Sequence, residues 1–311
     1  MVKLKLSLGS AISLGLMNGR LNVPFSTIYI MLGEECISNC LFCTQSRDAK
    51  KKKHLSRVTW YEFDLEKIIN KIKEKNYSRI CFQTLDYPDI LYDLLKVLPF
   101  FYKLNIPISV SIAPPIQGNL KSISDYVDTI SIALDAANDK LFEKIKGIER
   151  GNRFTWQDHW KCLIESRAFF KNVNTHLIVG LGESDKDLVN TMLRLKNLAI
   201  STALFSYTPV LGFGSKPTIE RYRKIQLARC LIYNYNTEID SFRFNENSEL
   251  EKIESKNLER AISDPSCFIT SGCLGCNRPF YNESPRNIYN FPYKPKDDDL
   301  LEIKNLLVKI K

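Results

Sequence analysis

Short runs of apolar and β-branched residues alternate with amphipathic stretches along most of the chain. The runs TIYIML (27–32) and RICFQ (79–83) are typical of buried strands. Between them, DLEKIINKIKEK (64–75) has apolar residues at helical spacing. The alternation continues, with strands predicted at 107–112, 128–134, 174–179 and 201–207, and helices at 88–103, 138–147, 156–171, 185–198 and 217–235.

This alternation predicts an α/β fold built from βα units around a parallel sheet. With a seventh strand at 239–244, the number of repeats favours a partial or complete (β/α) TIM-like barrel over a short open sheet. We expect three regions: an N-terminal extension (1–25), a barrel core (26–244) and a C-terminal extension (245–311). The last is predicted to contain a polar helix at 245–262 and a terminal helix in DDDLLEIKNLLVKI.

Composition adds few constraints on function. The chain has 311 residues, 44% of them hydrophobic and 25% charged, which is enough apolar material for a large core. It has no run of about 18 uncharged apolar residues, so no membrane span is predicted. The first residues, MVKLKLSLGSAISLGLM, loosely resemble a signal peptide, but glycine and serine interrupt the apolar stretch and no clear cleavage site follows. We therefore expect a cytoplasmic protein.

The formal net charge is +9 at pH 7, and residues 50–53 are four consecutive lysines. Such a run is usually a solvated loop. The sequence has no RNP, zinc-finger or helix-turn-helix signature, so nucleic acid is not an expected partner. An acidic protein partner is favoured by the charge.

Six of the nine cysteines fall into two clusters. The first cluster, Cys36, Cys40 and Cys43, has the spacing C-x3-C-x2-C and follows the strand predicted at 27–32. In a barrel, that is the end of the strand where the chemistry takes place. The remaining three are most simply interpreted as small buried hydrophobic residues: Cys81, Cys162 and Cys230.

Three closely spaced thiols suggest a metal site with one missing ligand. Structural zinc sites are closed and four-coordinate, and His54, eleven residues beyond Cys43, is a poor fourth ligand. Three thiolates on one loop suit a 4Fe–4S cluster that leaves one iron open to a small molecule.

The C-x3-C-x2-C loop, with Phe42 just before its last cysteine, resembles the signature of the radical S-adenosylmethionine (SAM) superfamily. The segment HLIVGLGES (176–184) resembles the glycine-rich strand end of biotin synthase and lipoyl synthase. The resemblance implies a barrel of the radical SAM type in which Cys36, Cys40 and Cys43 hold three irons. SAM would chelate the fourth iron and, after one-electron reduction, yield a 5′-deoxyadenosyl radical that removes hydrogen from an unactivated carbon.

The same resemblance implies a set of SAM contacts. Phe42 and the backbone of Ile178–Gly180 would face the adenine, and Asp135 would bind the ribose. Gln83 or Thr84 would hold the amino group. The complete implied set is Phe42, Gln83, Thr84, Asp135, Ile178, Gly180, Gly182 and Glu183.

The chain departs from the family pattern at two of these places. Ala133 stands where the family has an asparagine near the ribose, and FQTLD (82–86) stands where it has Gly-Gly-Glu. Gly180 and Gly182 also fit a tight strand-to-helix turn that binds no ligand.

The second cluster, Cys267, Cys273 and Cys276, has the spacing C-x5-C-x2-C. It fits a structural cluster or a zinc site that borrows a ligand. By resemblance to biotin and lipoyl synthases, it also fits an auxiliary 4Fe–4S cluster that gives up its own sulfide, with Cys273 and Cys276 acting in catalysis. Such clusters have one non-cysteine ligand, for which the loop offers Ser271, Asn277 and Arg278.

Three segments resemble the archaeal-type lipoyl synthases that use two paralogous radical SAM subunits: SAISLGL (10–16), LSRVTW (55–60) and SGCLGCNRPFYNE (271–283). The resemblance implies sulfur insertion at C6 or C8 of an octanoyl-lysine. That group would be carried by an acidic lipoyl domain or glycine-cleavage H protein, and a donor such as ferredoxin would supply electrons. Two alternatives remain: another radical SAM reaction, such as biotin-synthase-like sulfur insertion with the second cluster relaying electrons or binding substrate, and a non-enzymatic metal protein that binds nucleic acid.

Overall fold

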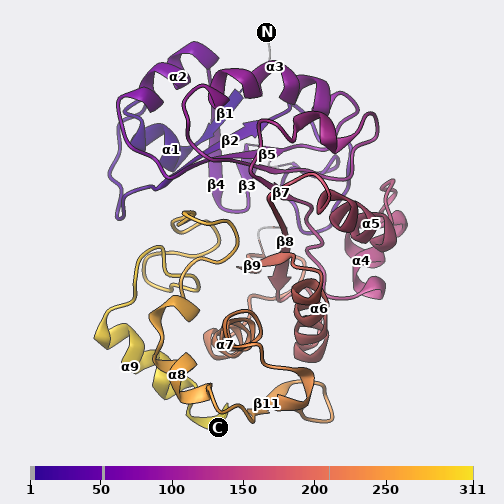
Figure 1. Cartoon of the computed structure of the whole chain (residues 1–311), viewed down its shortest axis with the longest axis vertical. Helices are drawn as coiled ribbons and strands as arrows, with labels where there is room; N and C mark the ends of the chain where they lie inside the picture. The colour runs from indigo at the N-terminus through magenta and orange to yellow at the C-terminus, as the bar shows by residue number, and fades with distance from the viewer. Residues whose placement is uncertain (1–3, 51–52, 210, 311) are drawn as a thin grey trace.

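The apolar runs pair into one curled nine-stranded sheet in the computed structural model, which describes residues 4–50, 53–209 and 211–310 (Figure 1). Lys51 and Lys52 of the lysine run lie outside the described residues. In spatial order the strands are β3 (His54–Leu55), β4 (Val58–Phe63), β1 (Leu4–Ser7), β2 (Thr27–Leu32), β5 (Arg79–Thr84), β6 (Ile108–Ser111), β7 (Thr129–Ser131), β8 (Asn172–Val179) and β9 (Ser201–Ser206).

Six of these strands, β2-β5-β6-β7-β8-β9, form a continuous parallel sheet. The sheet is a half-barrel that is open between its two edge strands, β3 and β9. This confirms the predicted α/β class in its partial-barrel form. Helices on the outer side of the curl connect the strands: α2 (Leu65–Lys73), α3 (Ile90–Tyr102), α4 (Asp139–Ile145), α5 (Trp156–Ser166), α6 (Asp185–Asn197) and α7 (Ile219–Tyr235) (Figure 1).

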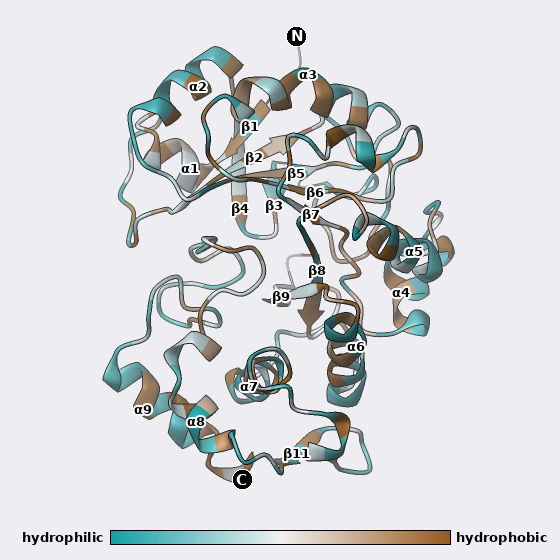
Figure 2. Ribbon diagram, viewed as in Figure 1, coloured by the Kyte–Doolittle hydropathy of each residue, from teal (hydrophilic) through white to brown (hydrophobic). Residues whose placement is uncertain are grey.

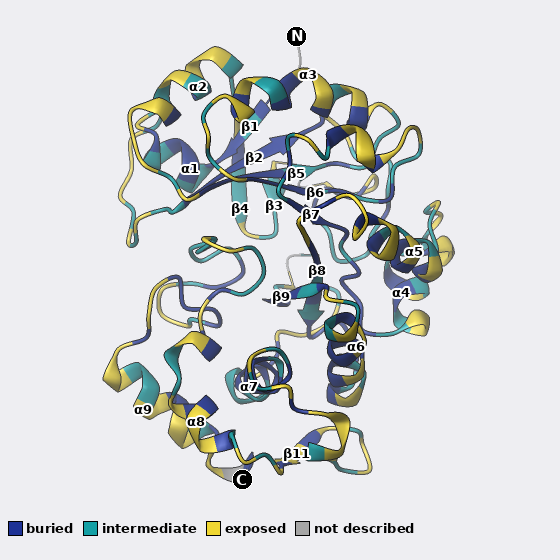
Figure 3. Ribbon diagram, in the orientation of Figure 1, coloured by how far each residue is buried: buried dark blue, intermediate teal, exposed yellow. Residues whose placement is uncertain are grey.

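Burial explains why these segments form these elements. Every residue of β2 is buried, as expected for a parallel strand covered on both faces. Helix α2 buries Ile68 and Ile72 and turns its lysines outward, and Figures 2 and 3 show the same division on the other outer helices. Capping boxes begin α5 at Thr155 and α6 at Ser184.

The N-terminal segment, predicted as an extension, contributes to the sheet. Strand β1 pairs antiparallel with both β2 and β4, and Leu4 and Leu6 are buried. Helix α1 (Leu8–Ser13) follows directly, and the Ser7 side chain caps it by accepting a hydrogen bond from the Ser10 N–H. Among the described residues, no helix combines the length and apolar character needed to cross a membrane.

Two predictions for the C-terminal region are wrong. The expected seventh barrel strand is β10 (Phe242–Phe244), which pairs only with β11 (Leu250–Ile253) in a separate two-stranded sheet. The expected polar helix at 245–262 is reduced to α8 (Leu258–Ser263). The predicted terminal helix is confirmed as α9 (Asp297–Leu306). Short 3-10 turns complete the fold: η1 (Leu120–Ile123), η2 (Ile148–Arg150), η3 (Ile239–Ser241), η4 (Pro265–Cys267) and η5 (Val308–Ile310).

Residues 268–293, here called the C-terminal loop, lie on the open side of the half-barrel (Figure 1). At edge strand β9, the Leu204 N–H donates to Ser271 Oγ (2.9 Å) and the Leu204 carbonyl accepts from Arg278 Nη2 (3.1 Å). Near the amino ends of β2 and β5, Ser26 Oγ donates to the Gly275 carbonyl and Arg79 Nε to the Leu274 carbonyl, each at 2.8 Å. The loop therefore satisfies an otherwise exposed strand edge and bridges the opening.

Candidate functional site

One cavity of about 480 Å³ lies inside the half-barrel. It is lined by residues from the barrel strands, from the loop after β2 and from the C-terminal loop. The two predicted cysteine clusters, far apart in sequence, both contribute to its wall: Cys36, Cys40, Cys43, Cys273 and Cys276.

The first cysteine loop is shaped by backbone hydrogen bonds to neighbouring segments. The Ile37 N–H donates to the carbonyl of residue 86 (2.9 Å), and the Leu41 N–H donates to that of Ile145 (2.8 Å). The Arg47 N–H closes the loop on the Ser38 carbonyl (2.8 Å). These bonds hold three thiols at the carboxyl end of β2, where we expected them.

The three cysteines of this loop are partly exposed at the cavity wall. Burial raises the pKa of Cys43 to about 12, and it also raises the pKa values of Cys36 and Cys40. Asn152 Nδ2 lies 3.8 Å from Cys40 Sγ, and the Gln45 N–H donates to Cys43 Sγ (3.4 Å). Because metal ligation requires thiolates, these cysteines fit a site in which bound cations displace the protons.

A buried ion pair lies beside this loop. Lys146 Nζ is 2.7 Å from Asp135 Oδ2 and also donates to the Ala133 carbonyl (2.5 Å). Burial alone lowers the pKa of Lys146, but Asp135 and then Cys40 outweigh it and raise that pKa. Asp135 has a left-handed backbone (φ 61°) and joins the sheet through bonds to His176 and Ile178. The carboxylate is thus held at the cavity wall by both its backbone and its partner.

The eight predicted SAM contacts fall into two groups. Five of them line the cavity: Phe42, Gln83, Thr84, Asp135 and Ile178.

The other three, Gly180, Gly182 and Glu183, form the turn after β8. The Glu183 carboxylate accepts from the Gly180 and Leu181 N–H groups (2.9 and 2.8 Å) and pairs with Arg221 (2.9 Å). A Cβ at Gly180 would lie 2.7 Å from the Ser215 carbonyl oxygen, so this turn requires glycine. Contact of all eight residues with SAM stays a prediction.

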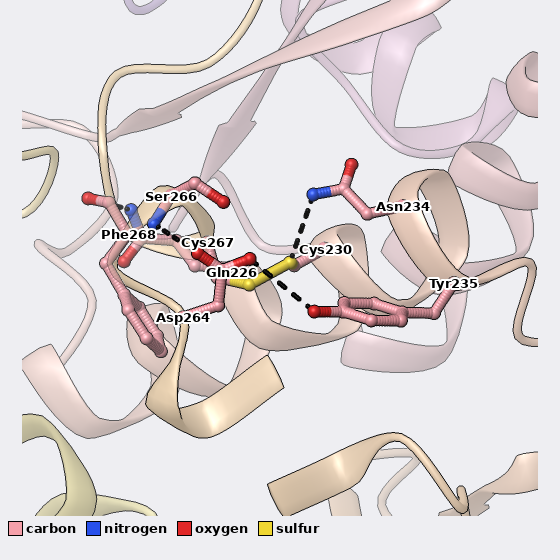
Figure 4. The surroundings of a disulfide bond; sticks show 8 residues. All are labelled: Gln226, Cys230, Asn234, Tyr235, Asp264, Ser266, Cys267 and Phe268. Atoms are coloured by element: carbon pink, nitrogen blue, oxygen red, sulfur yellow. Dashed lines mark hydrogen bonds between the residues drawn. A yellow bond between two sulfur atoms is a disulfide. The ribbon is translucent and has the colours of Figure 1, made fainter. Parts of the chain in front are cut away.

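The structure corrects the prediction that Cys267 is a cluster ligand. Cys267 forms a disulfide with Cys230 of α7, with an S–S distance of 2.01 Å (Figure 4). Both residues are buried away from the cavity, and Asn234 Nδ2 contacts Cys230 Sγ at 3.4 Å. The interpretation of Cys230 as a simple hydrophobic residue is corrected as well. Turn η4 directs Cys267 toward α7, whereas the following loop runs back to the barrel.

Cys273 and Cys276 remain at the cavity and meet a third thiol there. Tyr29 Oη lies 3.2 Å from Cys276 Sγ. Cys81 of β5 also lines the cavity, and Gln83 Nε2 donates to its sulfur (3.0 Å). Burial, followed by the proximity of Cys276, raises the pKa of Cys81 to about 11. Sequence reasoning missed Cys81 because an isolated cysteine in a strand is usually a core residue.

Of the three candidate non-cysteine ligands, only Arg278 lines the cavity. Ser271 Oγ already accepts from β9, and the Asn277 amide bonds two backbone groups just before β2. The Arg278 guanidinium lies over the Phe205 ring at 3.8 Å.

His176 is a further cavity residue that sequence reasoning missed. Burial lowers its pKa to about 4, so the imidazole is neutral at pH 7. The local signal available was its position in β8, two residues before Ile178, because residues two apart in a strand share a face.

The N-terminal segment and the β3–β4 hairpin contribute a mainly apolar part of the cavity lining, here called the apolar arm, which includes the Trp60 side chain. The apolar residues that line it are Leu8, Ile12, Val23, Phe25, Leu55, Val58 and Trp60. The same segments also contribute the polar residues Ser7, Arg20, Asn22 and Ser56.

Comparison with known proteins places this geometry in a family. A model of the radical SAM superfamily matches residues 30–195. A Methanocaldococcus jannaschii protein, "Uncharacterized protein MJ0785", is 25% identical over 192 residues, covering 61% of this chain and 48% of that protein. The chain thus spans about half the length of this relative.

Solved structures resemble the fold. Streptococcus suis SuiB superposes with a TM-score of 0.50 at 14% identity, over 69% of this chain and 46% of SuiB. The radical SAM methyltransferase TsrM from Kitasatospora setae gives a TM-score of 0.41 at 12% identity, over 62% of this chain and 41% of TsrM. At these identities the likeness concerns the fold alone. Because the superfamily model covers more than half of the 311 residues, and its match includes the C-x3-C-x2-C loop, the chain belongs to the radical SAM superfamily.

Proposed function

We propose that this radical SAM enzyme inserts sulfur into an unactivated C–H bond of a protein-bound octanoyl-lysine, as one subunit of a lipoyl synthase. One observation carries the proposal: two separate groups of cysteines face the same cavity. Cys36, Cys40 and Cys43 lie at the carboxyl end of β2, and Cys273 and Cys276 lie on a loop anchored at the amino ends of β2 and β5. A substrate carbon held between them has a hydrogen acceptor on one side and a sulfur source on the other.

The apolar arm supports an acyl substrate. Trp60, Phe25 and the aliphatic residues around them offer a surface that suits a saturated chain without polar groups. Each methylene buried there contributes about 0.8 kcal/mol to binding. An octanoyl group therefore gains affinity that an acetyl group cannot.

The proposed reaction replaces a hydrogen atom of the substrate by sulfur. When bound, SAM and the first cluster supply hydrogen abstraction, and an auxiliary cluster supplies sulfide. For each sulfur inserted, a C–H bond breaks and a C–S bond forms, while the hydrogen leaves in 5′-deoxyadenosine and SAM also yields methionine. A low-potential one-electron donor of the ferredoxin class would provide one electron per SAM. A cluster held by Cys273 and Cys276 would accept the electron released when the C–S bond forms.

Residues of the chain would orient SAM and attract the carrier protein. Asp135 and Lys146 present a fixed charge pair beside the first cysteine loop, where they orient SAM. Burial lowers the pKa of His176 to about 4, so this side chain adds no charge to the cavity wall at pH 7. The net charge of +9 favours an acidic lipoyl domain or H protein as the carrier, and a paralogous radical SAM subunit would insert the second sulfur.

The test uses the full chain, reconstituted anaerobically with iron and sulfide. It is incubated with SAM, a low-potential reductant and an octanoyl-lysine peptide, with and without the paralogous subunit. We expect a peptide heavier by one sulfur, measured by mass spectrometry, together with 5′-deoxyadenosine. A hexanoyl-lysine peptide should react more weakly, because the arm holds less of it, and an acetyl-lysine peptide should not react. SAM cleavage without any thiolated octanoyl product, under every reducing condition, would contradict the proposal.

We expect Asp135→Asn to weaken SAM binding by about tenfold, because a hydrogen bond to a charged group is worth about 1.5–3 kcal/mol. Asparagine tolerates the left-handed backbone at this position, so the fold should be kept. SAM affinity of the reconstituted protein can be measured by equilibrium dialysis. Asp139→Asn, an exposed carboxylate four residues further along, is the control. Equal affinities would mean that Asp135 only pairs with Lys146.

A further inference from the structure

The sequence predicts three thiol ligands for the auxiliary site, but in the structure one of them is not available. Cys267 is bonded to Cys230 and lies outside the cavity, which leaves Cys273 and Cys276 as a pair. Two thiolates would leave half of a 4Fe–4S cluster without protein ligands. The cavity wall offers a replacement in Cys81, which is free and buried.

We propose that Cys81 of β5, in place of Cys267, is the third thiolate ligand of the auxiliary cluster, together with Cys273 and Cys276. This inference rests on the proposed function in one respect, namely that an auxiliary cluster exists. The assignment of its ligands rests on the geometry of the chain alone.

Strand register places Cys81 beside the residue that contacts Cys276. Tyr29 of β2 pairs with Cys81 in the parallel ladder, so their side chains leave the same face of adjacent strands about 5 Å apart. Tyr29 Oη contacts Cys276 Sγ at 3.2 Å. Tyr29, Met31, Trp60 and Cys81 also belong to one small buried group, and Cys276 packs against it. Cys81 and Cys276 therefore share one pocket.

The loop that carries the other two thiols is fastened directly before Cys81. Arg79, two residues earlier, donates to the Leu274 carbonyl (2.8 Å). A Cβ built on Gly275 would lie 3.1 Å from Ser78 Cβ, and Gly275 has a φ of 79°. Only glycine combines this close approach with that backbone conformation, so the turn between Cys273 and Cys276 is seated on the start of β5.

The surroundings also suit an anionic cluster. Arg79 is 3% exposed and pairs with Asp128 (2.7 Å), and Arg278 lines the cavity. Because Asp128 already neutralises Arg79, the Arg278 guanidinium is the group that would offset part of the negative charge of thiolate-bound iron, which is costly to bury without cations nearby. Cys81 itself sits in a strand held between β2 and β6, a rigid support for a ligand.

The experiment removes the first cluster and counts the iron that remains. In a full-chain background with Cys36, Cys40 and Cys43 all replaced by alanine, anaerobic reconstitution should leave about four irons per chain, as one 4Fe–4S cluster requires. Adding Cys81→Ser should lower that iron content, and the absorbance of the cluster, at least about fourfold, since even the loss of outer-shell partners weakens metal sites by about 10–100-fold. The matched controls in the same background are Cys267→Ser and Cys162→Ser, which should keep their iron.

A second measurement tests the ligand assignment without any substitution, in case the Cys81→Ser variant fails to fold. In the iron-loaded unmutated chain, mapping by alkylation should show that Cys81, Cys273 and Cys276 become reactive only after a chelator removes the iron. Alkylation of Cys81 while Cys273 and Cys276 stay protected overturns the proposal. Retention of iron by a folded Cys81→Ser variant overturns it as well, and loss of iron by Cys267→Ser would then return the ligand role to Cys267.

The remaining outcomes separate this inference from the proposed function. If the triple-alanine background binds no iron, both fail, because no auxiliary cluster exists. If iron depends on Cys81 but the octanoyl peptide is never thiolated, the ligand assignment holds and the proposed reaction is wrong.

Discussion

Replacing Cys43 by alanine should abolish the reductive cleavage of SAM. We expect the rate of 5′-deoxyadenosine formation to fall more than about 100-fold, because loss of an outer-shell partner alone costs up to about that much. Cys43 is one of only three thiols at the end of β2, and the Gln45 N–H fixes its sulfur. Removing it leaves a second iron without a protein ligand, in addition to the one that SAM requires.

The measurement pairs activity with iron content. Under anaerobic conditions with excess reductant, the variant should lose about four irons per chain, which corresponds to one cluster. Cys162→Ala is the control, because Cys162 is a partly buried thiol of α5 outside the cavity wall and should leave both values unchanged. SAM cleavage at the unmutated rate by Cys43→Ala would remove the first cysteine loop from the mechanism.

The features that sequence predicted well are local ones. Strand β2 coincides with the TIYIML run because all six of its residues are buried. The first cysteine loop was identifiable because its three thiols lie within eight residues, immediately after that strand. Pattern and site are encoded by the same short segment, so no long-range contact was needed to recognise them.

The ligand set that we propose for the auxiliary site could not be predicted, because Cys81 is distant in sequence from Cys273 and Cys276. The spacing of Cys267, Cys273 and Cys276 is typical of one cluster motif. In the structure, however, Cys267 forms a disulfide with Cys230 of α7. Between Cys267 and Cys273, Gly272 packs so closely on β9 that a Cβ there would lie 2.7 Å from Ala203 Cβ. This close packing places Cys273 at the cavity inside the barrel, which Cys81 of β5 also lines. Only the tertiary fold distinguishes the two neighbouring cysteine environments.

Near both ends of the chain, the local sequence indicates a strand but does not determine which strand it pairs with. The apolar alternation of Leu4 and Leu6 was compatible with a strand, but its place between β2 and β4 depends on the β3–β4 hairpin far downstream. Conversely, residues 242–244 have strand character but find their partner in β11 and not in the barrel. Strand propensity identifies a strand without specifying its neighbour.

The contribution of one carboxyl group, Glu283 of the C-terminal loop, to stability should fall as the pH rises from about 4.5 to 7. Its side chain is 2% exposed, and the Asn290 N–H donates to its Oε1 (3.2 Å). Burial raises the pKa of Glu283 from 4.5 to about 7, although the nearby Arg278 partly opposes the shift. Between these two values the unfolded chain has already released the proton that the folded chain still holds.

The sign and size of the effect follow from this difference in bound protons. Because the folded state binds the proton more tightly, the stabilising contribution of Glu283 is complete below pH 4.5 and is lost as the pH passes through 7. A shift of about 2.5 pKa units corresponds to about 3 kcal/mol of unfolding free energy. Burial lowers the pKa of His176 to about 4 and also lowers the pKa of His159, and both histidines contribute the opposite slope in this range. The informative quantity is therefore the difference between variants.

We therefore expect Glu283→Gln, which keeps the side-chain shape without an ionisable group, to become more stable relative to the unmutated protein as the pH rises. Urea unfolding at pH 5, 6, 7 and 8, followed by far-UV circular dichroism, should show the difference growing by about 3 kcal/mol and levelling off above pH 7. Glu246→Gln, which removes an exposed carboxyl group, should run parallel to the unmutated protein. If the Glu283→Gln curve also runs parallel, the carboxyl group ionises normally and the wall formed by the C-terminal loop is open to water.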